Sequence, residues 1–577
     1  MMRAAKMMPV KRESMGEGRG EQGRLGPREM VVWALLVALL VCVRGWRLDA
    51  SCLWFDEVFS VHAARHGWGG LLDFVALDLI HPPLFYLLLK VWMALAGGGE
   101  SVWWLRLFPL LTQAAAVVPL LLLGRELGVR GDAMRVALLL WAVNGYLIQH
   151  AQGLRMYSLL LLCALCSLWL FARFTDAEAG RRRTGALAAL FAVNLLLVYT
   201  HYFGWLLVGL EGLFIAIQRR EKLKPFAVSL IALGVCFSPW VWLVMRASGA
   251  GEGLLAQNIG WQARPRLADI FHPFLLLHEP FRFRRNTYEP LVLRVDVWLA
   301  VALFAPPFVA LCWRAVRGRR HVEAQLPGDE TAREAAAGND AGGGRAAGDG
   351  AGRRPGLTFL LFFSFAPVVV AFVLARVLPQ SIWGTRHLII VAPVYLLLAS
   401  VAFVSLRRPV WLAVLLKVLL ACWLTLAAML WLMRPNAPPV WCAWETLAQR
   451  VVEADANAKG EVRVYAAEDL VAYHLWYGMS LTGDARFRVA AVKNLPGLSE
   501  DRAFFLPRGF NEVAAADASA AMREERFWVA FRDTSWNTEH PLLRLLAERG
   551  YELEERFEVS ASGQKAFIIS VKRRRER

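Results

Sequence analysis

The chain has 577 residues, of which 57% are hydrophobic, and it carries a net charge of +17 at neutral pH. Together with a mean hydropathy of +0.40, this composition excludes an ordinary soluble protein, and repeated apolar runs of about 17 to 25 residues indicate a polytopic membrane protein. The lysines and arginines gather in short loops between these runs, which is typical of cytoplasmic loops and argues against a nucleic-acid partner.

The N-terminal part consists of a polar segment and then an apolar one. Residues 1–29 are glycine-rich and basic, so we expect a disordered cytoplasmic tail. The run Met30–Trp46 begins too far from the first residue, and lacks the small-residue cleavage site, to be a cleaved signal peptide. We therefore predict that it is the first span and carries the chain from the inside to the outside.

Basic loops between the later apolar runs set the topology. The loops expected in the cytoplasm are 125–135, 181–183, 218–224, 314–354 and 407–408. With ten further runs alternating consistently between the two sides, the sequence predicts eleven spans in all. These ten runs are 103–124, 133–150, 155–173, 186–203, 204–217, 225–245, 296–313, 357–377, 387–406 and 409–433.

One apolar segment does not fit this alternation. Residues 84–96 look like another span, but counting them would invert every later loop. The segment is short, contains Lys90 and follows a proline pair, features that favour an interfacial or re-entrant segment. We expect it to lie at the outer face, within a long first external loop from Asp49 to about Ser101.

The distribution of apolar runs, polar segments and prolines predicts the domains. A transmembrane catalytic domain should cover 30–433, interrupted by a disordered cytoplasmic linker over 314–356, whose central part is rich in Ala, Gly, Asp and Arg. After the prolines between 435 and 439, residues 434–577 alternate helical and strand-like patterns and predict a small external α/β domain. Its expected helices are 445–454 and 541–549, and its expected strands are 461–466, 487–492, 527–531 and a hairpin over 551–571.

Eight cysteines are present, and six of them fall in apolar runs, where they behave as small hydrophobic side chains. Only Cys52 and Cys442 fall at positions expected outside, and the sequence leaves open a disulfide between them. No cysteine or histidine spacing typical of a metal site is present.

Asp56 and Glu57 form an adjacent carboxylate pair just past the first span, among Trp54, Phe55 and Phe59. Taken alone, two acids here can simply cap the next helix. Charge beside hydrocarbon is costly unless it has partners or a use, however, and later loops bring suitable partners to the same face.

The other polar residues expected on this face come from four stretches. They include Asp78 and His81, then Gln149, His150, Arg155 and Tyr157, then His201 and Tyr202, and finally Arg386 and His387. Singly, the arginines can be interfacial cations and the histidines ordinary interface residues. Together, two guanidinium groups and up to three histidines facing a carboxylate pair suit a large anion such as a phosphate.

The ordered strings WFDEVFS, HPPLFYLLL, QGLRMYSLLLL, YTHYFGWLL, FSPWVW and GTRHLIIVAPVYLLLAS resemble the bacterial protein-mannosyltransferase-like glycosyltransferases, a group that includes aminoarabinose-transferase-like enzymes. The resemblance covers about residues 30–433 and implies the GT-C fold. It also implies a polyprenyl-phosphate-linked sugar as donor and an acceptor glycan, lipid or protein at the outer face of the bacterial cytoplasmic membrane.

The resemblance implies roles for individual residues. Asp56 maps onto the catalytic base, with Glu57 beside it, while His81, Arg155 and Arg386 map onto contacts to the lipid phosphate. Tyr157 and His387 are expected with this phosphate site. Some relatives have Lys where His81 stands and Glu-Ala-Arg where this chain has Gly153-Leu154-Arg155, so a second acid in that loop is not expected.

Asp78, His201 and Tyr202 are expected to line the donor or acceptor pocket. The sequence identifies no cofactor and leaves a divalent metal open, with Asp78 and His81 as its candidate ligands.

Two other functions fit parts of the pattern. A multi-span transporter or flippase would also carry charges among its spans, but no duplicated half and no pair of broken helices is apparent. A lipid-linked polysaccharide polymerase or ligase would favour a very large external loop between late spans, whereas here the largest external block is C-terminal.

Overall fold

The computed structural model describes residues 27–178, 180–248, 263–281, 294–323, 355–434, 438–493, 506–517 and 523–574. Most of the predicted tail and linker therefore lies outside the described residues. Where the ends of these segments are described, the prediction is wrong, because helix α1 already begins at Pro27, α15 continues to Glu323 and α17 begins at Pro355. Arginine and alanine favour helix, and a helix started by an apolar span propagates into such a sequence at little cost.

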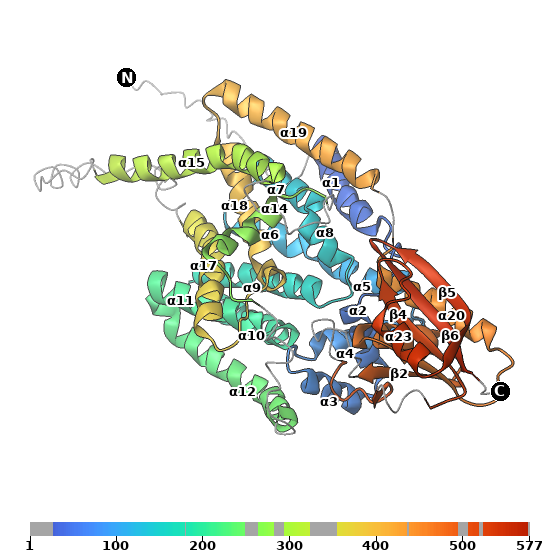
Figure 1. The fold of residues 1–577 in the computed structure, drawn as a ribbon. Coiled ribbons are helices and arrows are strands. Elements are labelled where there is room, and N and C mark those ends of the chain that lie inside the picture. Colours follow the sequence, from blue (N-terminus) through green and yellow to red (C-terminus); the bar gives the residue numbers. More distant parts are fainter. Residues whose placement is uncertain are drawn as a thin grey trace, which may run out of the picture.

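A bundle of apolar helices makes up the larger part of the molecule (Figure 1). Its helices are α1 (Pro27–Gly45), α5 (Val102–Ala115), α6 (Val117–Glu126), α7 (Asp132–Val143), α8 (Gly145–Ala151), α9 (Tyr157–Asp176), α10 (Arg181–Thr200), α11 (Phe203–Gln218), α12 (Leu223–Ser248), α14 (His272–His278), α15 (Val295–Glu323), α17 (Pro355–Val377), α18 (Ala392–Ser405) and α19 (Val410–Leu432), with short 3-10 turns η1 (Arg220–Lys222), η2 (Leu267–Phe271) and η4 (Thr385–Val391).

Every one of the eleven predicted spans coincides with a helix or a consecutive pair of helices. Within the described ranges, eight helical segments are long and apolar enough to cross a membrane. The predicted span 133–150 is broken into α7 and α8, because Asn144 adopts an extended conformation and its side chain caps α8 by accepting a hydrogen bond from the Leu147 N–H.

Three short helices follow α1, within the segment predicted to be the first external loop. They are α2 (Phe55–Arg65), α3 (Trp68–Asp78) and α4 (Leu84–Leu95). At 1.5 Å per residue α4 is about 18 Å long, too short to cross the hydrocarbon layer. It packs against α2 and has Phe85, Tyr86 and Leu89 buried; its position at the membrane interface stays a prediction.

The C-terminal region forms a six-stranded sheet in the order β3-β2-β1-β4-β6-β5. Its elements are η5 (Val440–Cys442), α20 (Ala443–Ala454), β1 (Val462–Ala466), α21 (Asp469–Thr482), β2 (Phe487–Lys493), β3 (Ala514–Asp517), β4 (Arg526–Asp533), α23 (Pro541–Glu548), β5 (Tyr551–Ala561) and β6 (Gln564–Arg573). The first four strands are parallel, and β6 and β5 extend the sheet antiparallel. Figure 1 shows this sheet at one end of the helical bundle, beside the short helices of the first external loop.

Both faces of the sheet are covered, which explains the apolar runs in its strands. Phe527 and Val529 of β4 belong to a core with Leu542 of α23, while Trp528 and Ala530 face the other core, which contains α20 and α21. The predicted helices and strands of this region are confirmed. Three elements, η5, α21 and β3, were not predicted; α21 is buried on nearly all sides and β3 is a run of alanines.

The sheet region is joined to the first external loop by a covalent bond and by packing. Cys52 and Cys442 form a disulfide, one of the options that the sequence leaves open. Helix α21 packs on α2, where the Tyr473 hydroxyl lies 3.2 Å from Nδ1 of His62. The start of the sheet region is therefore held close to Asp56.

Candidate functional site

Asp56 lies in the first turn of α2, where a helix N-terminus favours a carboxylate. Its side chain is 34% exposed, and its Oδ2 atom lies 3.9 Å from Nε of Arg155 and 3.9 Å from Nη1 of Arg386. Arg155 also donates a hydrogen bond of 2.8 Å from Nη1 to the main-chain oxygen of Asp56. The structure thus brings together one carboxylate and two guanidinium groups from three distant parts of the chain.

The charges around Asp56 set its ionisation. Burial alone would raise the pKa of this carboxyl group, but the nearby positive charges of Arg155 and Arg386 outweigh it and lower the pKa below its ordinary value. Asp56 is therefore ionised at neutral pH, as a proton acceptor must be.

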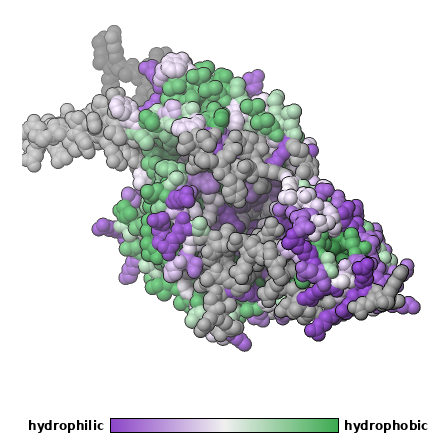
Figure 2. Space-filling view, in the orientation of Figure 1, coloured by the Kyte–Doolittle hydropathy of each residue, from purple (hydrophilic) through white to green (hydrophobic). Residues whose placement is uncertain are grey.

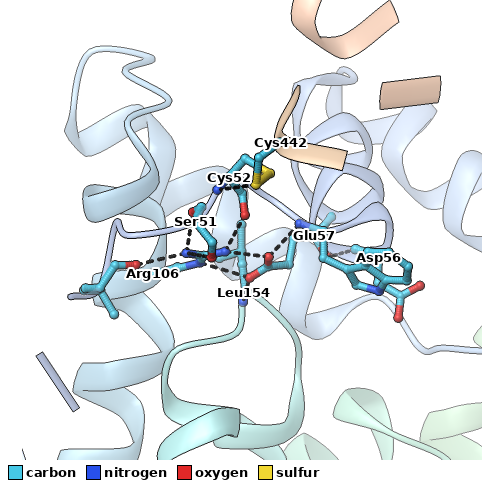
Figure 3. Close-up of polar contacts among 10 residues, drawn as sticks. Ser51, Cys52, Asp56, Glu57, Arg106, Leu154 and Cys442 are labelled. Atoms are coloured by element: carbon cyan, nitrogen blue, oxygen red, sulfur yellow. Dashed lines mark hydrogen bonds and ion pairs between the residues drawn. A yellow bond between two sulfur atoms is a disulfide. The ribbon is translucent and has the colours of Figure 1, made fainter. Parts of the chain in front are cut away.

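Glu57 is turned into the protein and points toward Arg106 (Figure 3). Its Oε2 atom lies 2.8 Å from Nη2 of Arg106, and its Oε1 atom accepts a hydrogen bond of 2.7 Å from the Leu154 N–H. The Trp54 N–H donates to the same carboxylate. These contacts fix the start of α2 against α5 and against the turn that carries Arg155.

Asp78 and His81 face each other at the end of α3, with 3.4 Å between Oδ2 and Nδ1. Burial raises the pKa of Asp78 to about 7, and burial together with the charge of Arg155 lowers the pKa of His81 well below its ordinary value. Both shifts favour a neutral pair that shares one hydrogen bond. The two candidate metal ligands therefore bind each other, and the described part of the chain contains no group of three side chains arranged to hold a metal. These residues do not fit a metal site.

An aromatic and imidazole cluster lies next to this pair. The ring of His201 lies 5.6 Å from that of His81, 5.1 Å from that of His387 and 6.1 Å from that of Tyr157. His201 is 3% exposed, and its Nε2 atom has no hydrogen-bond partner among the described residues. Four predicted site residues are thus grouped in one buried cluster.

Tyr202, like Asp78, His81, His201 and His387, is not among the described residues that line the pocket in front of Asp56. Its hydroxyl accepts a hydrogen bond of 3.0 Å from Nε1 of Trp240, and its ring packs near Phe237. Tyr202 therefore connects the start of α11 to α12 rather than joining the group around Asp56.

A pocket with a volume of about 760 Å³ opens in front of Asp56. Among the predicted residues, Asp56, Glu57, Gln149, His150, Arg155, Tyr157 and Arg386 line it. Further lining comes from the residues that follow α1, from the end of α19 and from the sheet region, namely Trp46, Arg47, Trp431, Arg434, Trp441, Ser562 and Gln564. Figure 2 shows hydrophilic residues in a hollow at the centre of the molecule, with hydrophobic residues gathered over the helical bundle.

Sequence reasoning missed two residues that build this site. Arg106 holds Glu57, and its position inside the apolar run 103–124 was an available signal, because a charge there needs a partner. The Gln152 side chain donates to the main-chain oxygens of Arg44 and Trp46, each at 3.0 Å, and so ties the turn before Arg155 to the end of α1. No sequence signal marked that contact.

The comparisons with known proteins bear on the fold. No family model and no curated protein matches the chain. The chain is similar to the crystal structure of ArnT from Cupriavidus metallidurans bound to undecaprenyl phosphate, with a TM-score of 0.54 at 13% identity over 93% of this chain and 97% of that chain. The apo state of the same protein gives a TM-score of 0.53 at 15% identity, over 94% and 98% of the two chains.

A crystal structure of the Archaeoglobus fulgidus oligosaccharyltransferase tethered with an acceptor peptide also matches, with a TM-score of 0.44 at 12% identity over 80% of this chain and 63% of that chain. The match to ArnT covers nearly the whole of both chains, so it includes the helical bundle and the sheet region together. The expectation drawn from the ordered motifs is confirmed: this multi-pass membrane protein has the GT-C glycosyltransferase fold.

Proposed function

We propose that this protein transfers a sugar from a polyprenyl-phosphate-linked donor to a hydroxyl group of an acceptor, at the outer face of the cytoplasmic membrane. Asp56 serves as the base, and the reaction is a single displacement with inversion at the anomeric carbon. The observation that carries the proposal is the position of the Asp56 carboxylate, 3.9 Å from both Arg155 and Arg386 at the edge of a large pocket.

The donor phosphate belongs between the two arginines. Each guanidinium group can donate two parallel hydrogen bonds to phosphate oxygens, and two of them match the charge of a phosphodiester that becomes a phosphate monoester. Arg155 is held by its bond to the Asp56 main-chain oxygen, so its position does not depend on the donor. Undecaprenyl phosphate bound to ArnT, a protein of the same fold, supports this choice of ligand class.

The displacement balances without a cofactor. The acceptor oxygen forms a bond to the anomeric carbon as its proton passes to a carboxylate oxygen of Asp56. The bond between that carbon and the phosphate oxygen breaks, and its electron pair leaves with the lipid phosphate. Because negative charge grows on the leaving group, Arg155 and Arg386 stabilise the transition state more than the ground state.

Donor binding also makes Asp56 a better base. The two arginines lower the pKa of Asp56. A phosphate placed on the same arginines cancels part of their positive charge, which raises the proton affinity of the carboxylate when the donor is in place. Glu57, with its oxygens bound to Arg106 and to the Leu154 N–H, acts as a positioning residue for Asp56.

Two features support the outer face as the side of reaction. Asp56 and Arg386 come from loops that the distribution of basic residues assigns to the outside. The Cys52–Cys442 disulfide lies beside them, and disulfides persist in oxidising compartments outside the cytoplasm.

The test uses the full chain in liposomes, with a radiolabelled sugar on polyprenyl phosphate and a membrane extract that supplies acceptors. We expect the label to move from the lipid phosphate to a second molecule. Movement of intact labelled lipid across the bilayer, without cleavage of the sugar-phosphate bond, would instead establish a flippase and overturn the proposal.

A further inference from the structure

We propose that the part of the pocket lined by four tryptophans and two further arginines is the acceptor subsite, and that it takes a negatively charged saccharide. This inference rests on the proposed function, since it assigns the half of the pocket that the donor phosphate does not use. Six side chains carry it: Trp46, Arg47, Trp54, Trp431, Arg434 and Trp441, all of which line the pocket.

Tryptophan pairs line this half of the pocket. The rings of Trp54 and Trp441 lie 4.4 Å apart at an angle of 61°, and those of Trp46 and Trp431 lie 6.3 Å apart. Indole faces bind the C–H faces of sugar rings, because each offers a flat, electron-rich surface and an N–H group at its edge. Four indoles around one pocket therefore favour a ligand built of sugar rings.

A membrane-interface belt does not account for all four tryptophans. Trp46 and Trp431 stand at the outer ends of α1 and α19, where belt residues occur. Trp54 and Trp441 lie instead beside the disulfide cysteines, Cys52 and Cys442, where the first external loop meets the sheet region. That pair is placed by the junction of the two regions and faces the pocket.

Two arginines, Arg47 and Arg434, are the charged residues of this wall among the described residues that line the pocket. Apart from the titratable His150, the charged side chains that line the pocket are four arginines, Asp56 and Glu57, and Glu57 is paired with Arg106. Arg155 and Arg386 are assigned to the donor, which leaves Arg47 and Arg434 on the acceptor side. A cleft lined by one sign of charge concentrates ligands of the opposite sign, so a carboxylated or phosphorylated saccharide fits better than a neutral one.

Arg47 occupies an unusual backbone conformation. Its φ angle is +54°, in the left-handed region that residues with a side chain rarely adopt and that glycine would fill at lower cost. The turn is held by the Gln152 side chain, which donates to the oxygens of Arg44 and Trp46 on either side of Gly45. A strained backbone at an arginine that lines the pocket fits a functional use of its side chain.

The wall contributed by the sheet region is also fixed in place. The Ser562 N–H, in the turn between β5 and β6, donates a hydrogen bond of 3.1 Å to the Pro438 oxygen. The Cys52–Cys442 disulfide anchors the neighbouring η5 turn to the first external loop. Because Asp56 lines the same pocket, a saccharide on this wall can present a hydroxyl group to the base.

The test measures binding of two defined probes to the full chain in lipid nanodiscs, by fluorescence anisotropy. We expect fluorescein-labelled tetragalacturonate to bind about tenfold more tightly than labelled maltotetraose, its neutral counterpart. Trp441→Ala and Arg434→Gln should each weaken tetragalacturonate binding about tenfold. Trp411→Ala and Arg463→Gln, at exposed positions away from the pocket, are the matched controls and should leave it unchanged.

Binding of undecaprenyl phosphate, measured on the same samples, separates this inference from the proposed function. It should survive Trp441→Ala and Arg434→Gln, and weaken with Arg386→Gln. Equal binding of the two saccharides, binding of neither, or binding unaffected by Trp441→Ala and Arg434→Gln overturns the acceptor subsite. If Arg386→Gln leaves undecaprenyl phosphate binding unchanged while saccharide binding is normal, the donor site is overturned and the acceptor subsite is not.

Discussion

Glu57 and Arg106 form a buried ion pair behind Asp56, with 2.8 Å between Oε2 and Nη2 and less than a tenth of either side chain exposed. Arg106 completes its hydrogen bonds with the main-chain oxygens of Leu48, Ser51 and Cys52. One arginine therefore holds the segment of chain that leads into α2, and its partner is the residue next to the proposed base.

Removing one member of this pair should destabilise the protein. Arg106→Met leaves the Glu57 carboxylate buried without its cation, which costs about 3–5 kcal/mol in comparable cases. We expect a clear fall in the thermal midpoint of the detergent-solubilised protein, and part of it should be recovered when Glu57→Gln is added. Glu461→Gln breaks the exposed pair with Arg463 and serves as the control, with an expected change of about 0–1 kcal/mol. An unchanged midpoint for Arg106→Met would contradict this role.

Asp56→Asn should lower transfer by a factor of about 10² to 10⁴, the usual contribution of a positioned base. The fold should persist, because the bond from Arg155 goes to the Asp56 main-chain oxygen and does not need the carboxylate. Transfer rate and thermal midpoint are measured on the same preparation, with Asp73→Asn, on α3 outside the pocket, as the matched control. Near-normal transfer by Asp56→Asn would remove this residue from the reaction.

Arg386→Lys should weaken transfer even though it keeps the positive charge. A lysine offers a single ammonium group in place of the planar fork that binds two phosphate oxygens. Arg386 is 37% exposed and lies at the pocket edge, so the substitution should leave stability unchanged. We expect a rise of about tenfold in the donor KM and a fall in kcat, because charge on the leaving group is larger in the transition state. A change confined to the acceptor KM would assign Arg386 to the other substrate.

Asp78 should make stability fall as pH rises. Its pKa is raised from an ordinary value near 4 to about 7 by burial, so between these values the folded protein retains a proton that the unfolded chain has lost. The free energy of unfolding therefore decreases across this window and levels off above pH 7. Asp78→Asn should remove this part of the pH dependence. The difference in thermal midpoint between the variant and the unsubstituted protein should therefore be more positive at pH 8 than at pH 4. The same difference at both pH values would show that Asp78 titrates normally.

Removal of the disulfide tests both its contribution to stability and the side of the membrane on which it lies. Cys52→Ser breaks the only described covalent link between the first external loop and the sheet region, and should cost about 2–4 kcal/mol. It also frees Cys442, which a membrane-impermeant maleimide added to intact cells should then label. Cys442 that reacts only after the membrane is opened would place this face, and Asp56 with it, in the cytoplasm. The Cys52→Ser/Cys442→Ser protein is the control for labelling elsewhere.

The helical bundle was largely predictable from the sequence. Charged side chains and unpaired backbone groups are costly in lipid, so the apolar runs mark the helices and the basic residues mark the loops. The periodicity of apolar residues did not predict the helices correctly where a side-chain contact or complete burial determined them. Asn144 divides one span by capping a new helix, and α21 is buried on every side, so it shows no polar face from which a helix could be recognised.

The site was predictable in part, and for a different reason. Asp56, Arg155 and Arg386 could be chosen because a charged residue beside a span needs a partner on the same side. The tryptophan and arginine wall could not, since it depends on how the sheet region docks. Neither Trp54 nor Trp441 gives any sign in sequence that their rings pack 4.4 Å apart in the lining of one pocket.

Two consecutive residues of α2 are bonded to two consecutive residues of the turn before α9: Glu57 to the Leu154 N–H, and the Asp56 oxygen to Arg155. In the proposed reaction, these two bonds fix the distance between the base and the arginine that binds the leaving phosphate, whereas separate segments carry the tryptophan side of the pocket. We therefore expect that an exchange of residues 438–442 and of the β5–β6 turn would change the acceptor and leave the proposed donor chemistry unchanged.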